Sequence, residues 1–311
     1  MWQLSIRDIA TKLLSGNIVA ILIAFAVAFS LPIILHWYLY RTGSTERSTE
    51  FLLLGPSGSG KTAFCSLLEQ RRKPGVQPRT THTSQVSSVV PVTLHPTVRA
   101  GTDRYRSVND PSLADTSKRQ IRCTLRDIPG HRKLRDLEAV HSLLGVTKST
   151  QVKNAARGII FMVDSTSLSD AGQLSQIAEY LYDVLVILQR RSNKLRQKSS
   201  LIANTPVLVA ANKQDLFAAL PATSIRAKLA AEIEAIRTTK RKGLMDARGD
   251  VAAAEDEQEL LGGDENVFDF NQLEEEIGVK FDVIGGTVVG GDEKDATSGV
   301  RSWEEWIASC L

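Results

Sequence analysis

The residues best suited to chemistry in this 311-residue chain begin with a glycine-rich loop. Residues 55–62 read GPSGSGKT, which matches the phosphate-binding pattern G-x-x-x-x-G-K-[ST] directly after the apolar run Phe51–Leu54. Glycines let a backbone curve around phosphates, so that its N–H groups and the next helix N-terminus point at them. Lys61 is expected to reach the β- and γ-phosphates, and Thr62 to ligate Mg²⁺. The predicted phosphate-binding residues of this loop are Gly55, Ser57, Gly58, Ser59, Gly60, Lys61 and Thr62.

A second motif, D-x-x-G, follows 65 residues after Thr62, at the end of a segment that reads as a strand. Asp127 is predicted to hold Mg²⁺ through a bound water, and the Gly130 N–H to contact the terminal phosphate. His131 occupies the position from which switch GTPases orient the attacking water, so it is the candidate catalytic residue. The alternative is a solvent-exposed histidine at the start of a loose helix.

The polar segment between these motifs is rich in threonine and resembles a mobile switch loop. In such loops a threonine completes the coordination of Mg²⁺ when the γ-phosphate is present. Thr83 is the predicted ligand, and Thr81 is the alternative.

The third motif, N-K-x-D, occupies Asn212–Asp215 after another apolar segment. The Asp215 carboxylate can accept hydrogen bonds from N1–H and the exocyclic amino group of guanine, a pattern that adenine does not offer. Asn212 is expected to support the loop and the base, and the Lys213 stem to pack over the base. The backbone N–H of Gly286 is the predicted donor to the guanine carbonyl oxygen. The three motifs in this order predict GTP and Mg²⁺ as the cofactors.

The elements that position these motifs are read from runs of apolar residues and their periodicity. The pattern predicts an α/β fold of the P-loop GTPase class, with a mostly parallel sheet covered by helices on both faces. The expected strands are 51–54, 89–94, 120–126, 157–164, 206–211 and 279–284. The expected helices are 61–72, 174–188, 225–236 and 302–307.

An uncharged apolar run, residues 18–35, precedes this domain. It is long enough for a membrane span, and Trp37, Tyr38 and Tyr40 suit an interfacial aromatic belt. Bulky residues at the end of the run argue against a cleaved signal peptide, and a buried core helix is the remaining alternative. Because GTP is plentiful in the cytosol, the nucleotide site must lie there. We therefore expect a short lumenal segment (1–16), a transmembrane helix (17–40), a linker (41–50) and a cytosolic GTPase domain (51–311).

Composition excludes several other classes of function. A net charge of +3 without a basic stripe gives no indication of direct nucleic-acid binding. Three widely spaced cysteines support neither a disulfide framework nor a zinc site.

Polar and acidic composition predicts disordered insertions near 99–119 and 238–266, the latter overlapping an acidic stretch from Asp250 to Glu276.

Together these features resemble the signal recognition particle receptor beta subunit family. The resemblance depends on the anchor, the D-x-P-G-H form of the second motif, the sequence FDFNQL at 268–273, and a terminal helix with two tryptophans. It implies a heterodimer in the endoplasmic reticulum membrane, in which the GTP-bound form holds the N-terminal domain of the alpha subunit near ribosomes and the translocon. The acidic insertion and Gly285-Gly286 depart from the usual pattern of the family.

Two alternatives remain open at this stage. An ADP-ribosylation-factor-like trafficking switch shares the fold, but Trp2 cannot be myristoylated and Cys310 is not placed for prenylation. The other alternative is an autonomous GTP-hydrolysing enzyme. No arginine is placed by the motifs over the phosphates, so we expect hydrolysis far slower than the roughly 10 s⁻¹ of a typical enzyme.

Overall fold

The fold is taken from a computed structural model, which divides into one unit of residues 1–47 and another of residues 48–311. The residues described are 18, 25–26, 28–33, 49–72, 81–99, 101, 121–132, 156–198, 205–247, 261, 268–288 and 299–311. Each unit is considered by itself.

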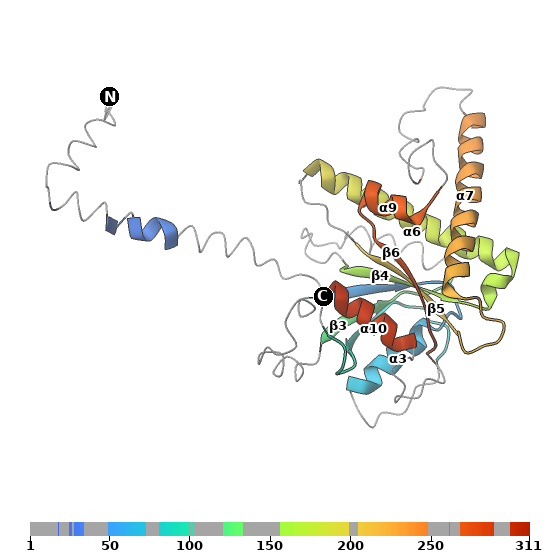
Figure 1. The fold of residues 1–311 in the computed structure, drawn as a ribbon, viewed down its shortest axis with the longest axis horizontal. Helices are drawn as coiled ribbons and strands as arrows, with labels where there is room; N and C mark the ends of the chain where they lie inside the picture. The colour runs from blue at the N-terminus through green and yellow to red at the C-terminus, as the bar shows by residue number, and fades with distance from the viewer. Residues whose placement is uncertain are drawn as a thin grey trace. The chain divides into compact units, whose positions relative to one another are not determined.

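The larger unit is organised around a six-stranded sheet in the order β2-β3-β1-β4-β5-β6 (Figure 1). All neighbouring strands are parallel except β2 and β3, which are antiparallel. The central strands β4 and β5 are almost wholly buried because both faces are covered, as expected of parallel sheets. The strands are β1 (Glu50–Leu54), β2 (Ser88–Thr93), β3 (Arg122–Asp127), β4 (Gly158–Asp164), β5 (Val207–Asn212) and β6 (Phe281–Gly285).

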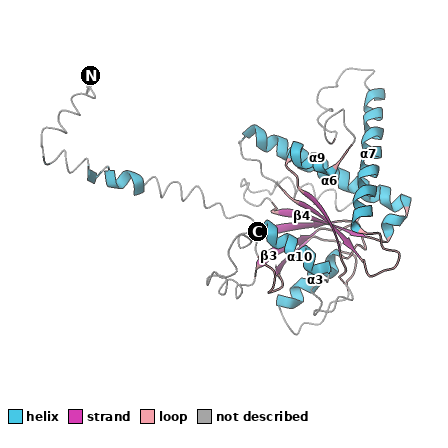
Figure 2. Ribbon diagram, in the orientation of Figure 1, coloured by secondary structure: helices cyan, strands magenta, loops and turns pink. Residues whose placement is uncertain are grey.

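Helices cover both faces of this sheet (Figure 2). Alternate residues of β1 face opposite sides, so Leu52 and Leu54 belong to one apolar cluster and Phe51 and Leu53 to the other. The first cluster includes α6 (Ala171–Lys198), α7 (Ala222–Ala247) and α9 (Phe270–Ile277), and the second includes α3 (Lys61–Arg72) and α10 (Gly299–Cys310). The predicted α/β class, with its mostly parallel sheet, is confirmed.

The predicted insertion at 238–266 is wrong for its first ten residues, because α7 continues to Ala247. Lys240 stabilises this extension: its Nζ lies 4.1 Å from the ring centroid of Tyr182 on α6 and 3.4 Å from Asp183. Leu261 is also fully buried, and its N–H donates to the Tyr182 hydroxyl. Of the other predicted insertion, 99–119, only residues 99 and 101 are described.

The acidic stretch also contains helix α9, which the sequence reading did not predict. Asp269 caps its N-terminus, and Gly278 ends it in a left-handed conformation with φ 75°. Its apolar side chains, Phe270, Leu273 and Ile277, are buried against the domain. The helical spacing of its apolar residues therefore determines the structure of this segment, although its acidic composition had predicted disorder.

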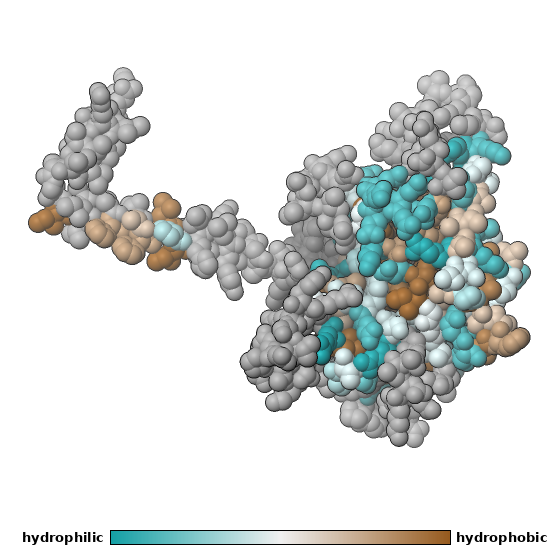
Figure 3. All heavy atoms as spheres, viewed as in Figure 1, coloured by the Kyte–Doolittle hydropathy of each residue, from teal (hydrophilic) through white to brown (hydrophobic). Residues whose placement is uncertain are grey.

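The N-terminal unit is helical at its described residues, between 18 and 33. Large apolar side chains there are exposed, including Ile18 (73%) and Phe29 (67%), and most of these residues are brown or tan in Figure 3. Among the described residues, no helix combines the length and apolar character needed to cross a bilayer. The predicted lumenal segment 1–16 and much of the predicted span 17–40 lie outside those residues.

Candidate nucleotide site

The phosphate loop joins β1 to α3 and packs tightly on neighbouring strands. Gly55 has φ 136°, and a Cβ there would lie 2.0 Å from the carbonyl oxygen of Met162 on β4. Gly60 has φ 99°, and a Cβ there would lie 2.2 Å from Nδ2 of Asn212. Only glycine fits at both positions, because each has a positive φ and leaves no room for a Cβ.

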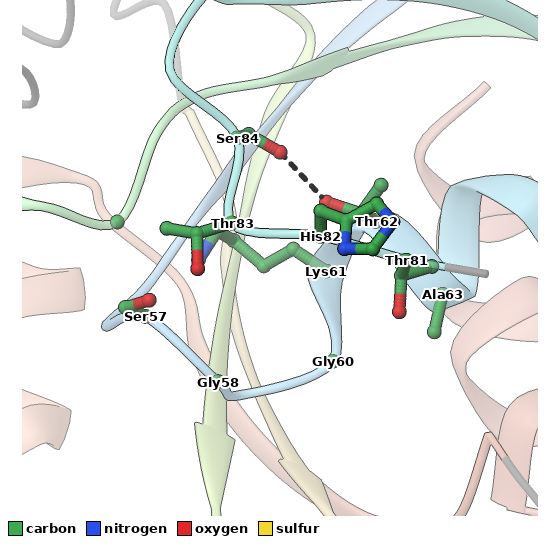
Figure 4. A pocket seen from close by; sticks show the side chains of 11 residues that line it. Ser57, Gly58, Gly60, Lys61, Thr62, Ala63, Thr81, His82, Thr83 and Ser84 are labelled. Atoms are coloured by element: carbon green, nitrogen blue, oxygen red, sulfur yellow. Dashed lines mark hydrogen bonds between the residues drawn. The ribbon is translucent and has the colours of Figure 1, made fainter.

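A cavity of about 200 Å³ opens beside this loop (Figure 4). Its walls come from three segments that are distant in sequence: the loop and the start of α3, residues 81–84, and Gly130 of the D-x-x-G motif. The structure therefore brings these predicted site residues together: Ser57, Gly58, Gly60, Lys61, Thr62, Thr83 and Gly130.

Lys61 lies along the inside of the loop. Its Nζ donates to the carbonyl oxygens of Gly55 (2.9 Å) and Pro56 (2.8 Å), and the residue is only 6% exposed. Burial lowers the pKa of this amine to about 8, although the nearby Asp127 carboxylate opposes the shift. A buried cation at this position favours an anionic ligand, because phosphate charge would replace the lost solvation.

Asp127, the predicted acidic ligand, lies behind the cavity wall, where it is hydrogen-bonded to the lining residue Thr62. The Thr62 hydroxyl donates to Oδ2 of Asp127 (2.7 Å), and Asp127 is 1% exposed. Its other oxygen, Oδ1, is buried and has no hydrogen-bond partner within the described part of the chain. Burial raises the pKa of this carboxyl, while the Thr62 hydrogen bond, the Lys61 charge and the Ser84 hydroxyl oppose the shift. Carboxylate and hydroxyl oxygens suit Mg²⁺, so the unpaired oxygen fits a cation site.

Ser84 is a site residue that the sequence reading missed. Its hydroxyl oxygen lies 3.0 Å from Oγ1 of Thr62 (Figure 4), whereas the predicted ligand Thr83 and the alternative Thr81 line the cavity without that contact. The three hydroxyl residues are equivalent in chemistry. Their order in the loop does not reveal which side chain turns towards Thr62, so only the tertiary structure singles out Ser84.

Gly130 packs on the phosphate loop, and a Cβ there would lie 2.5 Å from the backbone nitrogen of Ser57. His131 is exposed and lines a second cavity of about 560 Å³ together with Ser57, Gly58 and Lys213. The histidine therefore lies next to the phosphate loop but outside the smaller cavity. Its role in orienting water stays a prediction.

Asn212, the first residue of the guanine motif, connects three loops. Its side chain is buried (4% exposed), and Nδ2 donates to the Ser59 carbonyl oxygen (2.9 Å). Its Oδ1 accepts hydrogen bonds from the backbone N–H groups of Lys213 (2.8 Å) and Val288 (3.1 Å). The residue thus joins the phosphate loop to the two loops expected to surround the base.

Asp215 lies on the exposed side of this motif, where Oδ1 accepts a hydrogen bond from the Thr287 hydroxyl (2.8 Å). The backbone of Gly286, the predicted donor to the guanine carbonyl oxygen, is hydrogen-bonded within the protein in this structure, and its role in base binding stays a prediction. Its N–H donates to the Ala211 carbonyl oxygen (2.8 Å), and its carbonyl accepts from the Gln214 N–H (3.0 Å). Both backbone groups therefore pair Gly286 with the end of β5 and the loop after it.

Comparison with known proteins gives consistent matches. The family model for the signal recognition particle receptor beta subunit matches residues 46–277. The signal recognition particle receptor subunit beta of Saccharomyces cerevisiae is 29% identical over 269 residues, covering 86% of this chain and 87% of that protein. The SRb-GTP/SRX complex of the Chaetomium thermophilum receptor gives a TM-score of 0.55 at 30% identity, covering 83% of this chain and 96% of that one. The SRb-GDP-Mg structure from the same organism gives 0.55 at 31% identity, with 84% and 98% covered.

Proposed function

The chain belongs to the signal recognition particle receptor beta subunit family, and from that premise we propose that it is the GTP-binding subunit of such a receptor. In this function it would hold the alpha subunit at the endoplasmic reticulum membrane for co-translational protein targeting. The observation that carries the nucleotide assignment is the buried, unpaired Oδ1 of Asp127 beside the Thr62 hydroxyl. An acceptor of this kind needs a cation or a donor, and a family member is known with GDP and Mg.

Each part of the site has a separate task in this proposal. The loop N–H groups and Lys61 would bind the phosphates, and Thr62 would hold Mg²⁺ together with Asp127 acting through water. The chemistry that Mg²⁺ supplies when bound is neutralisation of phosphate charge. Ser84 is proposed as the switch residue that responds to the metal, in place of Thr83, because its hydroxyl already contacts Thr62. Asn212, Lys213 and Asp215 would select guanine.

The proposed partner is the N-terminal domain of the receptor alpha subunit. A relative of 30% identity forms a complex named SRb-GTP/SRX. In this chain the segment 81–84 leads towards the edge strand β2, and two valines are exposed there: Val86 (74%) just before the strand and Val89 (51%) within it. An apolar edge that continues from the switch segment suits a partner whose binding depends on nucleotide state.

The remaining parts of the proposal concern location. We propose a single span at 17–40 with the GTPase domain in the cytosol, close to ribosomes and the translocon, and without direct contact to nucleic acid. The uncharged run 18–35 and family membership support this arrangement.

The experiment is a pull-down of the alpha subunit's N-terminal domain with the full-length chain in detergent. Recovery should be high with GTP or a non-hydrolysable analogue, low with GDP, and lost in Thr62→Asn, which cannot ligate Mg²⁺ in the same way. Ser66→Asn, one turn further along α3 and absent from the cavity wall, is the matched control. Equal recovery with GDP and GTP would contradict a nucleotide-dependent clamp.

A further inference from the structure

Two side chains at the carboxyl ends of adjacent strands form an ion pair beside the proposed guanine site. Asp164 ends β4, and Lys213 follows the last residue of β5, with Asp164 in register with Asn212. The Lys213 ammonium donates to Oδ2 of Asp164. The Asp164 side chain is 17% exposed and that of Lys213 is 38% exposed, so the pair is partly shielded from water.

The other oxygen of Asp164 is also held. Oδ1 accepts hydrogen bonds from the backbone N–H (2.9 Å) and the hydroxyl (2.7 Å) of Thr166. Burial raises the pKa of this carboxyl, but the hydrogen bonds from Lys213 and Thr166 outweigh burial and lower it overall. The carboxylate is therefore charged and fixed in direction when it meets the lysine.

Lys213 is consequently constrained at both ends. Its backbone has φ 63°, the one positive φ outside glycine among the described residues, and its N–H donates to the Asn212 side chain. Its ammonium is attached to Asp164, so the aliphatic stem runs between two fixed points. Ordering a free lysine side chain costs conformational entropy. In this structure the side chain is already ordered before a nucleotide binds.

We propose that Asp164 is a positioning residue for guanine-nucleotide binding, holding the Lys213 stem where it packs on the base. The inference rests on the proposed nucleotide site and adds to it a residue outside the three motifs. Pre-ordering of a contact side chain strengthens binding mainly by slowing dissociation. The effect should be the same for any purine nucleotide, because the stem contacts the face of the ring and not its edge.

The discriminating variant is Asp164→Asn. The asparagine carbonyl can still accept both Thr166 hydrogen bonds, while its amide presents donors to the Lys213 ammonium in place of an acceptor. We expect tritiated GDP to dissociate about two- to fivefold faster from the full-length variant than from the wild type, as for a partly exposed ion pair. The melting temperature without nucleotide should stay within a few degrees. Asp170→Asn is the matched control, because Asp170 is an exposed carboxylate whose Oδ1 accepts from the nearby Gly172 N–H.

A second background separates positioning from a structural role in the turn. In Lys213→Met the ammonium is gone, so adding Asp164→Asn should change the dissociation rate less than twofold. An unchanged rate in the single variant, or the same acceleration with and without the lysine, would overturn the proposal. If the wild-type chain bound no guanine nucleotide, the proposed function itself would fail. If the wild type bound GDP and Asp164→Asn released it at the same rate, only the positioning role of Asp164 would fail.

Discussion

Asp215→Asn should weaken GTP binding and favour xanthosine triphosphate. In the structure Oδ1 of Asp215 accepts from the Thr287 hydroxyl. An asparagine can keep that hydrogen bond through its own carbonyl, so the side chain keeps its orientation. Its amide then takes the place of Oδ2 and substitutes a donor for the acceptor that guanine requires. Xanthine carries an oxygen where guanine has the amino group, so the same amide suits it.

The magnitude follows from the number of contacts and their exposure. A carboxylate that accepts from N1–H and the amino group makes two charge-assisted hydrogen bonds, each worth about 1.5–3 kcal/mol. Because Asp215 is exposed, solvent screens its charge, and we count the free energy of one such hydrogen bond in place of two. This free energy corresponds to a loss of about ten- to 150-fold in GTP affinity.

The assay is equilibrium dialysis of the full-length protein with GTP and, separately, with xanthosine triphosphate. Asp170→Asn removes the same charge from an exposed loop position and should leave both affinities within twofold. Wild-type GTP affinity in Asp215→Asn would exclude residues 212–215 from base recognition. Loss of both nucleotides together would indicate local unfolding and not a change of specificity.

Two further predictions concern the anchor and the thiols. Deletion of residues 1–45, which precede β1, should give a monomer by gel filtration that still binds GTP; aggregation of a well-expressed truncation would place the apolar run 18–35 in the domain core. Burial raises the pKa of Cys123 to about 12 and that of Cys310 to about 11, so both thiols stay protonated at pH 8. Both should therefore react slowly with a thiol reagent until the protein is unfolded. Rapid labelling of either thiol in the native protein would show that its surroundings are open to solvent.

The sequence alone predicted the parts of this protein that depend on neighbours in the chain. The predicted helix 61–72 coincides with α3, and each motif follows the strand expected before it. These features are local: apolar runs determine the strands, and glycine spacing determines the loop between β1 and α3. The phosphate site could be anticipated for that reason, as could the strand that precedes each motif.

The sequence also indicated FDFNQL as a feature of the family without revealing its task. The structure gives Phe270 of this motif a packing role, since its ring stacks on Phe281 of β6 with centroids 3.8 Å apart. Arg226 of α7 lies over both rings and donates to the Phe281 carbonyl oxygen. The motif attaches α9 to the edge of the sheet, a role that depends on Phe281 of the next strand and on Arg226, more than 40 positions earlier in the chain.

Tertiary structure decided which of several equivalent groups meet. Ser84, and not Thr83, turns towards Thr62, because the path of the loop into β2 sets the direction of each hydroxyl. The Gly286 N–H pairs with β5 because β6 continues in register past its last residue. Asp164 reaches Lys213 only because β4 and β5 are neighbours in the sheet. A hydrogen bond between residues that are far apart in sequence depends on the direction of two chains in space, and that direction is fixed by packing of the whole domain.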